Sequence, residues 1–207
     1  MGYVSGDADY IVDGVLTEGE AWVGLASSTL SSGASQIDIY LNDYGSGNTK
    51  LNTSQYVELV VIGSLRALHG GAGEYTSPTL VKFGQSVGLA SGYYQTYWYG
   101  VSQNSDFKTE LSDAYFGYVA SNSADSDIFT GFISRFGPVS TGLFKTAEHL
   151  VFNDVNYQST ENTLGLSYNV LHEDGLIDML RFKSNAPSGF IAGSRLDVYG
   201  VLPRMAQ

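Results

Sequence analysis

The chain has 207 residues, of which 43% are apolar and only 15% charged, so it can build one β domain with a substantial core and is too apolar for a disordered protein. Ten lysines and arginines oppose 21 acidic residues, and the resulting net charge of −11 disfavours binding to nucleic acid or to an acidic membrane surface. The sequence contains no cysteine, which excludes disulfides and cysteine-ligated metal sites.

The chain begins with an acidic stretch. Its acidic residues, with no lysine or arginine among them, are Asp7, Asp9, Asp13, Glu18 and Glu20. We expect residues 1–20 to form an extended acidic N-terminal arm, either solvated or used for docking, and residues 21–207 to form the folded domain. No basic start leads into an apolar segment, and no apolar run approaches the roughly 20 residues that span a bilayer. We therefore expect synthesis in a cytoplasm without membrane insertion.

Strand-forming runs recur along the rest of the chain, separated by clusters of Gly, Ser, Asn and Asp. The predicted strands are residues 21–30, 36–41, 55–62, 79–83, 93–101, 114–120, 128–136, 149–155, 163–169, 176–182 and 194–202. Helix signals are short, and the best candidates are turns at residues 106–112 and 141–148. Strands at this spacing, with some long connections, predict an all-β fold: a single antiparallel β-sandwich of jelly-roll type.

The last predicted strand ends five residues before the end of the sequence given. Because side chains alternate along a strand, Leu196 and Val198 point one way and the polar residues between them point the other. We expect this strand to complete a sheet and to place Leu196 and Val198 in the core. In residues 36–41 the same alternation places three aliphatic side chains on one face.

The sequence offers no catalytic, cofactor or metal site. His149 and His172 lack the helical spacing of a zinc motif, and we interpret both as structural. No G-x-S-x-G elbow is present, and the glycines of residues 70–73 lack the lysine and the helix that a phosphate loop needs. Asp125 and Asp127 could offer oxygens to calcium, but without the full calcium-loop pattern we interpret them as a solvated turn.

One aromatic run is the candidate for a binding surface. It comprises Tyr93, Tyr94, Tyr97, Trp98 and Tyr99. Tyrosine and tryptophan combine apolar area with a polar tip, which suits sugar stacking or a protein interface. Three interpretations stay open for this run: packing in the core, a subunit interface, or a glycan-binding surface. Tyr93, Tyr97, Trp98 and Tyr99 are the candidate interface or glycan residues.

Several segments resemble landmarks of a bacteriophage family of virion structural proteins, a jelly-roll group found in head-decoration and tail-appendage proteins. Residues 26–39 resemble its early pattern of small residues before an alternating strand, and residues 56–66 resemble a tyrosine-led hydrophobic strand that ends near an arginine. The closing pattern consists of residues 176–182 followed by Phe190, Gly193, Ser194, Tyr199 and Gly200. The middle third of the chain departs from the family pattern, and Phe83-Gly-Gln lacks the acidic residue of its usual turn.

The resemblance implies a non-enzymatic structural protein on the particle surface, either a capsid decoration or head-auxiliary protein or a collar or tail component. It implies a homo-oligomer, a trimer by family analogy, that contacts the major capsid protein or a tail or collar protein. The expected location is the virion, after synthesis in the host bacterial cytoplasm, and a head position is slightly favoured. The alternatives are a host-glycan-binding adsorption module of a tail appendage and a polysaccharide-degrading enzyme.

Overall fold

The protein is all-β in a computed structural model, as the sequence predicts. The structure describes residues 11–12, 15–16, 22–41, 53–68, 76–84, 93–99, 104–111, 113–124, 127–140, 142–153, 163–172, 174–185 and 189–203. Within these ranges the one helical element is a 3-10 turn, η2 (Thr53–Gln55). No helix in the described part of the chain has the length and apolar character needed to cross a membrane.

Twelve strands belong to one hydrogen-bonded sheet. They are β3 (Trp22–Thr29), β4 (Gln36–Tyr40), β5 (Glu58–Ala67), β6 (Thr76–Gly84), β7 (Tyr93–Tyr99), β8 (Asn104–Leu111), β9 (Ala114–Ser121), β10 (Thr130–Gly137), β11 (Lys145–Asn153), β12 (Thr163–Leu171), β13 (Met179–Ser184) and β14 (Arg195–Val201). Two further strands, β1 (Ile11–Val12) and β2 (Val15–Leu16), pair with each other within the expected N-terminal arm.

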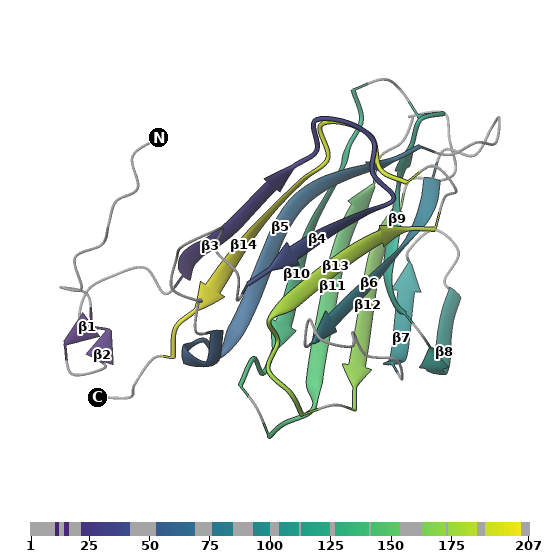
Figure 1. The fold of residues 1–207 in the computed structure, drawn as a ribbon. Helices are drawn as coiled ribbons and strands as arrows, with labels where there is room; N and C mark the ends of the chain where they lie inside the picture. Colours follow the sequence, from purple (N-terminus) through teal and green to yellow (C-terminus); the bar gives the residue numbers. More distant parts are fainter. Residues whose placement is uncertain are drawn as a thin grey trace.

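The path of strands folds back on itself into two layers (Figure 1). The larger layer has the order β3-β14-β5-β10-β11-β12-β7-β8, and the smaller layer has the order β4-β13-β6-β9. The layers join where the end of β5 pairs with the end of β9, Arg66 opposite Ala120 and Ala67 opposite Ser121. This pairing is parallel, so the prediction of a purely antiparallel sheet is wrong at the junction.

Two sequence-based expectations about local structure are also wrong. Residues 106–112 were expected to be a helical turn, but residues 106–111 lie in β8, which pairs with β7, and residue 112 lies outside the described residues. The second expected turn, residues 141–148, overlaps the start of β11, where Lys145 lies opposite Leu171 of β12. In both places cross-strand pairing outweighs the local helical preference of a polar run.

Aromatic rings from both layers fill the space between them. Phe116 of β9 contacts Phe132 of β10 edge to face, with ring centroids 4.8 Å apart. Phe83 of β6 contacts Phe136 of β10 in the same way at 5.4 Å, and Phe116 contacts Phe182 of its own layer at 5.4 Å. Edge-to-face contacts of this kind add to the free energy gained by burying the rings. They fix the two layers against each other.

The closing strand β14 lies inside the larger layer, between β3 and β5. Leu196 and Val198 are buried, which confirms the prediction that they belong to the core. The strand also packs closely at Gly200, where a Cβ atom would lie 2.5 Å from Cδ1 of Tyr56. Glycine is therefore required at this position because the tyrosine ring occupies the space of a side chain.

Replacing Gly200 with alanine tests this close approach. We expect Gly200→Ala to lower the free energy of unfolding by about 1–3 kcal/mol, because the Tyr56 ring and its neighbours must shift. Urea unfolding followed by circular dichroism measures the change. Gly131→Ala in β10 is the matched control, since a Cβ atom there meets nothing within 4 Å. We expect its effect to stay within about 0.5 kcal/mol, and equal losses in the two variants would contradict the packing argument.

Candidate interaction surface

The side of the larger layer that faces away from the smaller layer carries a group of exposed apolar side chains. Their exposed fractions range from 38% to 50%, and they lie on four neighbouring strands, β5, β10, β11 and β12. We call this group the outer apolar face; it consists of Ile62, Ile133, Phe152, Leu164, Leu166 and Tyr168. Because contiguous exposed apolar surface is a common feature of interaction sites, we take this face as the candidate surface.

The cross-strand register makes the face continuous. Ile62 lies opposite Ile133, and Phe152 lies opposite Leu164. Between these pairs, the half-buried Leu150 lies opposite both Ile133 and Leu166. Directly opposed side chains on neighbouring strands have Cβ atoms roughly 5 Å apart, so these residues contact one another across the strands.

Strand β12 forms the densest part of the face because its polarity is inverted. Leu164, Leu166 and Tyr168 point outward, whereas the alternate residues Ser167 and Asn169 are buried. Ser167 Oγ donates to the carbonyl oxygen of Phe116 at 2.9 Å, and Asn169 Nδ2 donates to that of Tyr115 at 3.1 Å. Both acceptors belong to β9, at an irregularity in its pairing with β6. The inward polar groups therefore satisfy buried carbonyls of the other layer.

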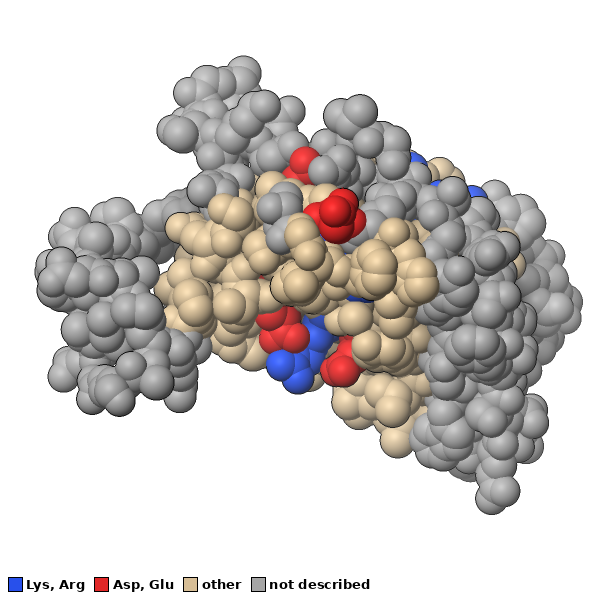
Figure 2. All heavy atoms as spheres, turned by 90° about the horizontal axis from the view of Figure 1, so that it is seen from below, with Lys and Arg blue, Asp and Glu red and all other residues tan. Residues whose placement is uncertain are grey.

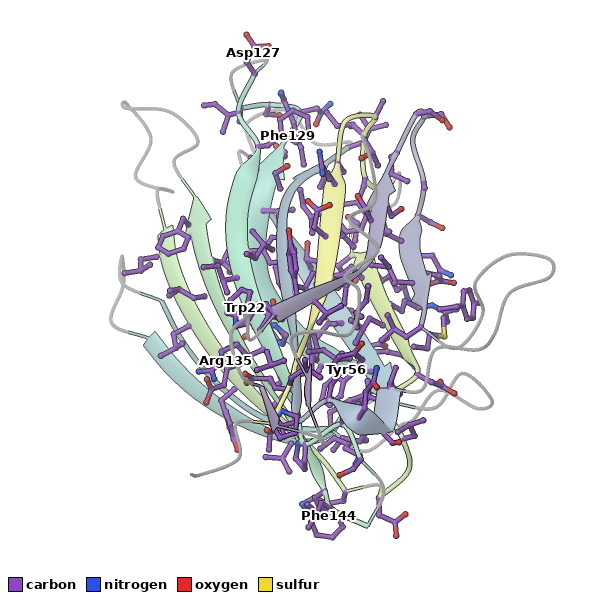
Figure 3. All side chains as sticks on the ribbon, turned by 90° about the vertical axis from the view of Figure 1, so that its left-hand side faces the viewer. Trp22, Tyr56, Asp127, Phe129, Arg135 and Phe144 are labelled. Carbon is purple, nitrogen blue, oxygen red and sulfur yellow. The ribbon has the colours of Figure 1, made fainter. Side chains whose placement is uncertain are left out.

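Charges along one border of the face balance each other closely. Arg135 Nε lies 2.9 Å from Glu58 Oε1, and Glu148 is the cross-strand partner of Arg135. The hydrogen bond to Glu58, then the charge of Glu58, and to a smaller extent that of Glu148, raise the pKa of Arg135. Two carboxylates and one guanidinium give a net charge of −1 here, against −11 for the chain. Arg135 points away from the smaller layer (Figure 3).

The described surface at one end of the molecule is also sparsely charged. Figure 2 views the end that lies at the bottom of Figure 1, where few acidic and basic side chains are in view; one acidic and basic group lies together near the centre, and the other charged side chains lie apart from one another. This end includes Phe144, which is exposed and stacks on His172 with ring centroids 4.7 Å apart. His172 is thus an exposed residue stacked on a neighbouring ring, and its structural interpretation stays a prediction. Asp127 lies at the opposite end (Figure 3).

Within the aromatic run, Tyr93 belongs to the core. Its side chain is fully buried, and its hydroxyl donates to the carbonyl oxygen of Phe83 and accepts from the Phe83 amide, both at 3.1 Å. Core packing is therefore the correct alternative for Tyr93. Tyr93 is no longer a candidate for the binding surface. The side chains of Tyr97, Trp98 and Tyr99 lie outside the described part of the structure. An interface or glycan role for these three residues stays a prediction.

The backbone of β7 nevertheless places this run beside the outer apolar face. Trp98 is the cross-strand partner of Leu166, which belongs to the face, whereas Tyr97 is the partner of the buried Ser167. Sequence reasoning thus selected a strand adjacent to the face but missed the face itself. The signal for it was present in β12, where every second residue from Leu164 to Tyr168 is large and apolar.

Two buried basic side chains, His149 and Lys145, have pKa values below their ordinary ones. His149 of β11 is fully buried, and its Nδ1 lies 2.8 Å from Ser134 Oγ. Its Nε2 has no hydrogen-bond partner among the described residues, and burial lowers the pKa of the imidazole to about 3. Lys145 is buried as well and donates to the carbonyl oxygen of Ser140. Burial lowers the pKa of Lys145, while the charge of Asp174 opposes that shift.

A Ser–His pair can serve nucleophilic catalysis, but only where a substrate reaches the serine. Ser134 and His149 are both closed off from solvent, with the rings of Phe116 and Phe136 about the imidazole. We therefore interpret the pair as a hydrogen bond of the core. Among the described residues no three His, Asp or Glu side chains gather in a way that could hold a metal ion. Of the two aspartates considered for calcium, Asp125 lies outside the described residues.

The buried imidazole makes stability depend on pH. The pKa of His149 is about 3 in the folded protein against an ordinary value of 6.5, so the unfolded chain binds the proton more tightly. The stability contributed by the neutral form is complete above pH 6.5 and is lost as the pH falls towards 3. We expect the free energy of unfolding to decrease over this range by roughly 4–5 kcal/mol from His149 alone. Urea unfolding at a series of pH values measures it.

The double variant Ser134→Ala/His149→Leu isolates this effect, since replacing both partners of a buried hydrogen bond with apolar groups leaves no polar atom unpaired. Its stability should fall less steeply than that of the wild type below pH 6.5. Ser134→Ala alone is the control, because it keeps the buried imidazole, and it should keep the wild-type slope. Identical slopes in the double variant and the wild type would contradict the assignment.

The described residues thus provide one broad apolar surface, and the buried His149 and Lys145 are closed off from solvent. The surface can bind by excluding water from apolar side chains, and its border offers an ion pair for orientation. Comparisons with protein-family models, with curated proteins and with solved structures find no match to this chain.

Proposed function

We propose that this protein is a non-enzymatic structural component of a bacteriophage particle, made in the bacterial cytoplasm and carried on the virion surface. The outer apolar face carries this proposal, because six large apolar side chains at 38–50% exposure form a continuous surface that a partner would remove from water. The resemblance in the sequence supplies the setting. It favours a capsid decoration or head-auxiliary protein, or else a collar or tail component, in contact with the major capsid protein or a tail protein.

The order of the strands supports a jelly-roll frame for this role. In a jelly roll, antiparallel strand pairs fall alternately into two sheets. Here β3 pairs with β14 and β5 with β10 in the larger layer, while β4 pairs with β13 and β6 with β9 in the smaller one. Strands β7, β8, β11 and β12 then widen the larger layer. Viral capsid proteins are among the proteins that have this architecture. The strand order therefore supports the proposal by analogy of fold.

Residues that carry the resemblance also contact one another. The ring of Tyr56 lies against Gly200, and Ser194 Oγ accepts from the amide of Arg66 at 3.2 Å. These four positions come from two segments of the chain that the resemblance treats separately. Because they contact each other, we interpret the two segments as one structural unit that anchors the closing strand. Self-association belongs to the same proposal, and the resemblance implies three copies.

The proposal predicts that purified particles of the phage encoding this chain contain the protein in a fixed ratio to the major capsid protein. Quantitative mass spectrometry across a density-gradient peak measures that ratio. A ratio corresponding to hundreds of copies places the protein on the head, and a handful places it on the tail or collar. An abundant host protein serves as the control for contamination, because its ratio changes across the peak. Particles that contain none of this protein would refute the proposal.

A further inference from the structure

We infer that the outer apolar face is covered by the same face of a second copy of this chain, the two copies being related by a twofold axis. The inference rests on the proposed assembly role, since it names the partner of that surface. The inferred pair of two copies differs from the trimer that the sequence resemblance implies. A surface that meets its own copy does so about a twofold axis, whereas a threefold ring needs two different surfaces.

The area of the face fits such a pair. A large side chain presents on the order of 200 Å² when fully exposed, so the six residues present roughly 500 Å² per copy at their exposed fractions. Two faces brought together would remove about 1,000 Å² from water before any border residue is counted, which reaches the size expected of a specific interface.

The distribution of charge favours a second copy over an ionic partner. None of the six side chains is charged. Glu58, Arg135 and Glu148 along one border sum to −1. On the neighbouring strand β14, Asp197 lies opposite Ile62 and forms an ion pair with Arg195, so these two charges cancel. Two such faces therefore meet with little repulsion, although each chain carries a net charge of −11. A strongly basic partner would find no complementary charge on the face itself, and nucleic acid would find no cationic row.

The geometry of a sheet also permits the contact. Two sheet faces pack about 10 Å apart with their strands roughly 30° from parallel, and their side chains interdigitate. The outer apolar face presents side chains from four adjacent strands in register, as such packing requires. Leu164, Leu166 and Tyr168 of β12 would then enter the spaces between side chains of the partner.

The test compares the solution mass of the wild type with that of charged variants. Light scattering coupled to size exclusion at micromolar concentration should give twice the chain mass of 22.3 kDa for the wild type. Ile133→Lys/Leu166→Lys should give the mass of one chain with unchanged circular dichroism and thermal midpoint. The control Leu68→Lys/Leu143→Lys adds the same charge at exposed leucines outside the face and should stay a dimer. A wild type of one or three chain masses, or a dimer in both variants, would overturn the inference.

A cysteine at the centre of the face gives a second readout that does not depend on disrupting the pair. Because the natural chain has no cysteine, Ile133→Cys introduces a single thiol. Oxidation with diamide should convert most of this variant to a covalent dimer within minutes, and Leu143→Cys should remain largely monomeric. Equal cross-linking of the two variants would contradict the face-to-face arrangement. A particle that contains the protein while these tests fail would leave the proposed function standing and remove only this pairing.

Discussion

Arg66 holds the two layers of the protein together at the point where β5 reaches from one to the other. Its side chain is buried, with Nε 3.2 Å from the carbonyl oxygen of Ser121 and Nη2 2.9 Å from that of Ala124. Its own carbonyl oxygen accepts from the amide of Ile191, and its amide donates to Ser194 Oγ. A buried guanidinium is tolerated only when such acceptors surround it. The end of β9 and the start of the closing strand are therefore both positioned by one residue.

The junction of the two layers at Arg66 could not be predicted from the sequence. The hydrogen bonds of Arg66 join it to residues 55 and 128 positions away, and no local pattern encodes pairing at that range. What the sequence does encode is alternation, which correctly placed Leu196 and Val198 in the core. The polar run of β8 carries no comparable alternation of apolar residues, so its strand character depends on its pairing with β7.

The outer apolar face was missed for a related reason. Alternation in β12 separates Leu164 and Leu166 from Ser167 and Asn169, but it does not say which set faces inward. The ordinary expectation puts leucines in the core. Here the irregular pairing of β9 leaves carbonyl groups that need donors, and Ser167 and Asn169 supply them from the opposite layer. Hydrogen bonding between the layers thus decides which side chains of β12 point into the core.

The fold therefore constrains the inward-facing positions of β12 but not its outward-facing positions. The fold requires Ser167 and Asn169 to point inward, because turning them outward would leave the carbonyl oxygens of β9 buried without a donor. It places no such demand on the outward positions, whose side chains lie outside the core, so Thr or Lys there would be compatible with the same strand. Within a single chain, Leu164, Leu166 and Tyr168 contribute only cross-strand contacts and partial burial, which many other side chains could also supply. Their exposed area is what the proposed pairing with a second copy of the chain would cover.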